Sequence, residues 1–179
     1  AIVGVLSSGS GGRAVEIQQE ADAWHVLAET CEAVVSAEGH FQSLMVDSVE
    51  FLGAGKRKDV EWIGGSFPGN EPAGKVVREG KSLLAERDAV VVRYDFEDKR
   101  FTVRSEGGTV RWFLSDQVTA CISKDGVIRP SRARGDVYRI VAGKATVAVD
   151  QPHHVVFGLM FPSRLTRGGK PEEPFCAQW

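Results

Sequence analysis

The sequence predicts a single α+β domain: one long N-terminal amphipathic helix packed on a strongly twisted, mostly antiparallel β-meander of about seven to nine strands, rolled toward a barrel. Three observations predict this class. Apolar residues spaced by three and four mark a helix over residues 13–37. Beyond residue 39, alternating apolar residues and closely spaced turns mark short antiparallel strands. The 179 residues, 42% of them hydrophobic, suit one domain spanning residues 1–179.

The predicted helix depends on one apolar stripe and one stop signal. The glutamates of this segment avoid the stripe, as in a helix with one buried side. Gly39 follows the last turn and predicts the end of the helix. The stripe consists of Ile17, Ala21, Trp24, Ala28, Cys31 and Val35.

Residues 41–161 are predicted to form the meander, because glycine-containing turns separate short alternating runs. Gly64 to Gly74 is rich in Gly and Pro and predicts a long surface loop or lid, with its order left open. Residues 1–12 are predicted as an N-terminal strand with a Gly/Ser loop, and residues 163–179 as a C-terminal tail.

Charge is unevenly distributed along the chain, although the net charge is only -2. The first 50 residues carry eight acidic side chains and one basic one, which leaves +5 for the remainder. This pattern indicates either an acidic helix beside a basic sheet or a basic surface for an anionic partner. The pI of about 6.1 argues against a nucleic-acid-binding domain. No apolar run reaches the length of a transmembrane segment, so we expect a soluble chain.

Three cysteines form at most one internal disulfide. An odd number slightly favours a reducing, cytoplasmic compartment. The chain begins with Ala1, so export with a cleaved leader stays open.

A Gly/Ser loop directly before the predicted helix is a candidate phosphate site, because backbone N–H groups and a helix N-terminus attract anions. The Lys-Ser/Thr ending of a P-loop is missing, and a flexible entry with Ser10 or a neighbour as the cap is the alternative. The candidate residues are Ser8, Gly9, Ser10, Gly11, Gly12 and Arg13.

His153 and His154 are the candidate catalytic residues, with surface or capping roles as the alternative. Neighbouring residues of a strand face opposite sides, so both cannot bind one metal ion with ordinary geometry. No Cys or His spacing predicts a metal site, and no pattern assigns a cofactor.

Aromatic and arginine residues of the meander are candidate ligand-binding residues, because a half-closed sheet can contain a small apolar ligand. The alternative is that the aromatic side chains fill the core. The candidates are Trp62, Tyr94, Phe96, Trp112, Arg111 and Arg139.

Three functions follow, and whether the protein is an enzyme is left open. The leading hypothesis is a non-enzymatic module that holds a hydrophobic small molecule or presents an aromatic and arginine face to a protein partner. The second is an assembly subunit that forms homo- or hetero-oligomer contacts through its terminal segments, including Phe175 and Trp179. The third is an enzyme acting on a phosphate-bearing or anionic substrate.

Overall fold

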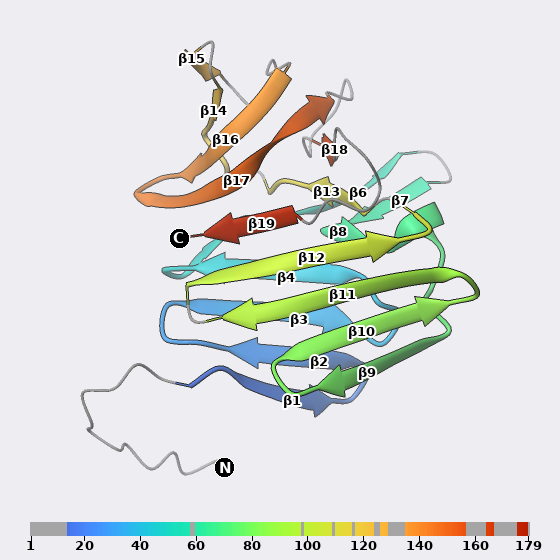
Figure 1. Cartoon of the computed structure of the whole chain (residues 1–179). Coiled ribbons are helices and arrows are strands. Elements are labelled where there is room, and N and C mark those ends of the chain that lie inside the picture. The colour runs from blue at the N-terminus through green and yellow to red at the C-terminus, as the bar shows by residue number, and fades with distance from the viewer. Residues whose placement is uncertain are drawn as a thin grey trace.

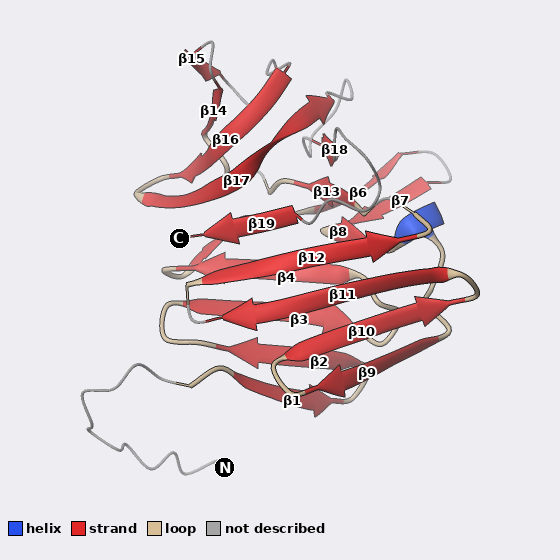
Figure 2. Cartoon of the chain, viewed as in Figure 1, coloured by secondary structure: helices blue, strands red, loops and turns tan. Residues whose placement is uncertain are grey.

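The computed structural model describes residues 14–57, 60–97, 99–108, 110–115, 117–123, 126–128, 135–156, 164–166 and 175–178. Within these ranges the chain consists of β-strands, turns and one short 3₁₀ helix, η1 (Pro68–Asn70), as Figure 2 shows. In the described residues, no helix is long and apolar enough to span a lipid bilayer.

Two antiparallel meanders dominate the fold and lie in two layers, one behind the other in Figure 1. The first layer comprises β1 (Glu16–Glu20), β2 (Ala23–Leu27), β3 (Cys31–Ser36) and β4 (Phe41–Val46). The second comprises β9 (Lys75–Glu79), β10 (Ser82–Arg87), β11 (Val90–Glu97) and β12 (Arg100–Glu106).

Among the described residues, shorter and later strands connect the layers into one sheet of 17 strands, whereas β6 and β7 form a separate hairpin. The route between layers runs from β4 through β8, β13, β18, β17 and β19 to β12. The remaining strands are β5 (Val49–Glu50), β6 (Ala54–Arg57), β7 (Val60–Ile63), β8 (Gly65–Ser66), β13 (Arg111–Phe113), β14 (Ala120–Ser123), β15 (Gly126–Ile128), β16 (Gly135–Ala142), β17 (Ala145–Val156), β18 (Arg164–Thr166) and β19 (Phe175–Gln178).

The predicted helix over residues 13–37 is wrong, because the described part of this segment forms β1, β2 and β3. Val26 and Ala33 are buried, although they lie off the helical stripe, and they face each other across β2 and β3. Ala21, which belongs to the stripe, is exposed in the turn after β1 with a φ of 48°. Burial therefore follows period two within three short strands.

The antiparallel, β-rich architecture expected for the rest of the chain is confirmed, with more strands than expected and two layers in place of a sheet rolled toward a barrel. Two-residue turns separate many strands, as at Gly80–Lys81 and Gly143–Lys144. Both glycines have positive φ, which lets the chain reverse without steric strain.

The core lies between the two meanders, where alternate residues of most strands are buried. In the first layer, buried Ile17, Val26, Ala33 and Leu44 form one row across the strands. In the second, buried Leu83, Tyr94 and Val103 form a corresponding row.

The predicted surface loop at Gly64 to Gly74 is wrong over its first half, because Gly64 to Pro68 are buried. Gly65 pairs with Phe41 on one side and Trp112 on the other, which places this segment inside the sheet. A Cβ on Gly65 would lie 2.5 Å from the Trp112 ring, so the close approach requires glycine.

The C-terminal segment is part of the sheet and contains two strands in its described residues. β18 pairs with β13 and β17, and β19 pairs with β12 and β17. Phe175 lies opposite Val103 in this pairing, whereas Trp179 lies outside the described residues. The backbone of β19 is therefore docked on this chain.

Candidate functional site

Three of the four aromatic residues predicted as ligand-binding from the sequence meet in the core. Tyr94, Phe96 and Trp112 are all buried and surround the ring of Phe41, which is itself fully buried. The Phe41 ring centroid lies 5.5 Å from that of Tyr94, 6.0 Å from Phe96, 5.1 Å from Phe101 and 5.4 Å from Trp112. At these distances the rings are in contact, so this aromatic cluster packs the two layers together.

The Tyr94 hydroxyl donates a hydrogen bond of 2.7 Å to the backbone oxygen of Gly39, in the turn between β3 and β4. Complete burial raises the pKa of this phenol, so the hydroxyl remains a donor at neutral pH. The bond therefore ties β11 of the second layer to a turn of the first.

Replacing Tyr94 by Phe is expected to lower the free energy of unfolding by about 1–3 kcal/mol, because the buried Gly39 oxygen loses its phenolic partner. The matched control is Thr119→Val, which removes an exposed hydroxyl that donates to the Val141 carbonyl at 3.2 Å. Urea unfolding should show a clearly smaller loss for the control, and equal losses would contradict the role of burial.

The other predicted ligand residues lie on different strands. Trp62 lies in β7, Arg111 in β13 between β8 and β18, and Arg139 in β16 between β14 and β17. Their side chains lie outside the described part of the structure, so the predicted aromatic and arginine face stays a prediction.

The predicted catalytic histidines occupy neighbouring positions of β17, with His153 opposite Val137 and His154 opposite Asp136. Their side chains are outside the description, as is the entire predicted phosphate loop from Ser8 to Arg13. Among the residues described, no group of three or more His, Cys, Asp and Glu side chains is placed to hold a metal ion.

The outer face of the first layer carries carboxylates between half-buried apolar residues. Across β1 to β5, the directly opposed positions are Glu16, Leu27, Glu32, Met45 and Glu50 in that order. Glu16 and Glu32 are exposed, whereas Leu27 and Met45 are half-buried. We call this row and its neighbour Val34 on β3 the acidic face.

The Asp, Glu, Lys and Arg residues of this layer are all acidic. Residues 14–50 contain eight Asp and Glu residues and no Lys or Arg. The acidic N-terminal region of the sequence therefore becomes one sheet layer whose meander has no Lys or Arg, and half-buried His25, opposite Val34, is the basic residue beside the row.

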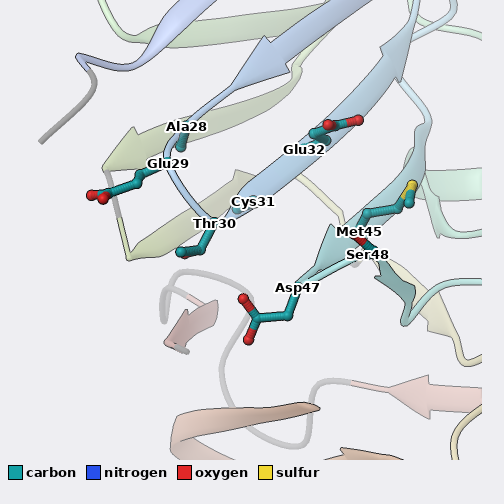
Figure 3. Close-up of a pocket in the computed structure, with 8 residues that line it drawn as sticks. All are labelled: Ala28, Glu29, Thr30, Cys31, Glu32, Met45, Asp47 and Ser48. Carbon is teal, nitrogen blue, oxygen red and sulfur yellow. The ribbon is translucent and has the colours of Figure 1, made fainter. Parts of the chain in front are cut away.

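A pocket of about 220 Å³ opens at one end of the acidic face, and Figure 3 shows the residues around it. Glu29 comes from the turn between β2 and β3, Glu32 from β3, and Asp47 from the turn between β4 and β5. The Asp47 N–H donates a bond of 3.0 Å to the Thr30 carbonyl, which holds the two turns together. The remaining lining residues are Ala28, Thr30, Cys31, Met45 and Ser48.

Hydrogen bonds within the chain hold the side chain of Glu50, at the end of the row. One carboxylate oxygen accepts bonds from the N–H groups of Leu44 at 2.9 Å and Leu52 at 2.8 Å, and the other accepts one from the Ser43 hydroxyl. Glu50 therefore stabilises the connection between β4 and β5, in contrast to exposed Glu32.

The acidic face is not among the residues predicted as a site, although the charge asymmetry of the sequence signals it. The sequence pattern assigned Glu16, Glu29 and Glu32 to a helix and Asp47 and Glu50 to the meander, which places them on different surfaces. Comparisons with protein-family models, curated proteins and solved structures give no match, so the site is defined by the geometry of this chain alone.

Proposed function

We propose that the protein is a non-enzymatic binding module that presents its acidic face to a protein partner bearing a basic, Lys- or Arg-containing segment. The observation that carries the proposal is the outer row of Glu16, Leu27, Glu32 and Met45, in which exposed carboxylates alternate with half-buried apolar side chains. Glu50 ends the row, and its carboxylate is bound within the chain.

Such a surface is complementary to an extended segment in which basic and apolar residues alternate at every second position, because only every second side chain of an extended segment faces the same surface. Opposite charges guide the encounter and fix the register, and the apolar residues add contact area. The pocket beside Glu32 has the size and negative lining to accept one Lys or Arg side chain, whose aliphatic stem can contact Met45.

The proposal retains the class of function expected from the sequence and moves the binding surface. Packing of Tyr94, Phe96 and Trp112 around Phe41 favours a structural use of these rings.

The test measures binding of a fluorescent peptide with the repeat Arg-Ser-Val-Ser, the Arg/Val peptide, to the full chain by anisotropy, because this repeat places Arg and Val in turn on one face of an extended peptide. Glu32→Lys is expected to weaken binding about tenfold or more, because it reverses an exposed charge at the centre of the row. Glu106→Lys, which changes an equally exposed Glu on β12 of the other layer, is the matched control and should have little effect.

Added salt should weaken the interaction, since exposed charges are screened. Equal weakening by both variants would mean attraction by net charge alone. Failure of the wild-type chain to bind the Arg/Val peptide better than a Glu/Val peptide would contradict the proposal.

A further inference from the structure

Residues 67–74 connect β8 to β9. Hydrogen bonds hold this connection against the turn between β3 and β4 and against β10. The Ala73 N–H donates a hydrogen bond of 2.8 Å to the Glu38 carbonyl, and the Gly74 N–H donates one of 2.8 Å to the Glu86 carbonyl. At the other end, the Phe67 N–H donates a hydrogen bond of 3.0 Å to Nδ1 of His40. Of these three amide bonds, only the one to His40 has an acceptor that can be protonated near neutral pH.

His40 is held in a buried position with a defined proton arrangement. The residue is 6% exposed, and its backbone N–H donates to the Ser36 hydroxyl at 3.2 Å. Because Nδ1 accepts from Phe67, it carries no proton, and the neutral ring has its proton on Nε2. Nε2 lies 3.7 Å from a carboxylate oxygen of Glu38.

Four titratable or charged groups surround this region. Glu38 belongs to the same turn, and its carboxylate raises the pKa of His40, but burial is the larger influence and lowers the pKa from its ordinary value of 6.5. Tyr94 of β11 reaches the turn through its bond to the Gly39 oxygen. Arg87 of β10 lies 5.5 Å from the Phe67 ring centroid and pairs with Glu71 at 2.7 Å.

Protonation of His40 is incompatible with the contact to Phe67. A proton on Nδ1 places an N–H group opposite the Phe67 N–H, so two donors face each other in a buried site and the amide loses its acceptor. The Glu38 carboxylate, 3.7 Å from Nε2, can balance the charge of the imidazolium.

We propose that His40 is a pH-sensitive latch for residues 67–74: the neutral ring holds the Phe67 end of the connection, and the protonated ring releases it. The Ala73 end stays in place, because its bonds to backbone carbonyls do not titrate. The latch is independent of the acidic face.

The direction of the pH effect follows from the lowered pKa. The unfolded chain takes up the proton at a higher pH than the folded chain, so the neutral ring contributes stability that is complete above about pH 6.5. This contribution is lost as the pH falls from there toward the lower pKa of the folded state.

The experiment follows amide hydrogen exchange of the full chain by NMR between about pH 7.5 and 4.5, with each rate corrected for its intrinsic pH dependence. The protection factor of the Phe67 amide is expected to fall about tenfold or more, with the same midpoint as the His40 ring signals. The amides of Ala73 and Gly74 are internal references and should retain their protection. Unchanged protection of Phe67, or a parallel loss at all three amides, would overturn the proposal.

Two variants separate the latch from general acid destabilisation. His40→Asn places an amide oxygen near the position of Nδ1 and does not titrate, so its Phe67 protection should be independent of pH over this range. Glu38→Gln should keep the transition but move its midpoint to lower pH, because the carboxylate that raises the pKa of His40 is removed. A pH-dependent loss in His40→Asn as large as in the wild type would refute the latch, as would a higher midpoint in Glu38→Gln.

Discussion

Replacing Gly64 by Ala is expected to prevent formation of the stable native sheet or to lower the free energy of unfolding by about 4 kcal/mol or more. Gly64 has a φ of 27°, and a Cβ at this position would lie 2.0 Å from the Phe41 carbonyl oxygen. A backbone atom of a neighbouring strand cannot move aside as a flexible side chain can. The Gly64 N–H donates to the Gly53 carbonyl at 2.9 Å, and its own carbonyl accepts from Phe113 at 2.7 Å, so displacement would also break these bonds.

Gly80→Ala is the matched control for this substitution. Gly80 also has a positive φ, of 61°, but nothing lies within 4 Å of the Cβ that Ala would add. This variant should lose only the roughly 1–2 kcal/mol that a left-handed backbone costs a residue with a Cβ. Urea unfolding of both variants measures the difference, and a similar stability for the two would show that the clash at Gly64 is relieved.

The turns of the second layer and of β16 and β17 could be predicted because their residues have special conformations. Gly143 lies in a two-residue turn where the sequence has glycine between alternating runs. Glu97 lies opposite Arg100, where the alternating apolar run of β11 ends. Here local turn chemistry and period-two alternation agree with the final structure.

The first layer could not be predicted in the same way, because its first reversals contain neither Gly nor Pro. Ala21 and Asp22 connect β1 to β2, and Glu29 and Thr30 separate β2 from β3. Residues 17, 24, 28, 31 and 35 fit both a helical stripe and the alternating positions of three strands. Val26 and Ala33 distinguish the two interpretations, since a helix would place them off its apolar side whereas strands bury them.

Charge was a better guide to the candidate site than motifs were. The excess of acidic residues before residue 50 is visible in the sequence, and the structure turns it into one sheet layer with an acidic outer face. The opposition of Glu32 with Leu27 and Met45 depends on the register of β3 with β2 and β4, and the β2–β3 reversal that sets half of this register contains no Gly or Pro. The link between His40 and Phe67 joins residues 27 positions apart and has no sequence signature.

Replacing Phe41 by Ala is expected to lower the free energy of unfolding by about 3–5 kcal/mol, since this ring is fully buried at the centre of the aromatic cluster. Its removal leaves Tyr94, Phe101 and Trp112 without the ring that each of them contacts. Phe41→Leu keeps most of the volume and should lose roughly 1–2 kcal/mol. Denaturant unfolding checks the order of the two variants, and a loss for Ala no greater than that for Leu would contradict a closely packed cluster.

The same variant distinguishes a packed core from a site for an apolar ligand. An apolar cavity left by a deleted ring can bind benzene, so benzene should raise the melting temperature of Phe41→Ala. The wild-type chain should show no such increase, because Phe41 already occupies the space between the surrounding rings. Stabilisation of the wild-type chain by benzene would instead favour the small-molecule form of the binding module, whereas stabilisation of the variant alone would assign the cluster to the core.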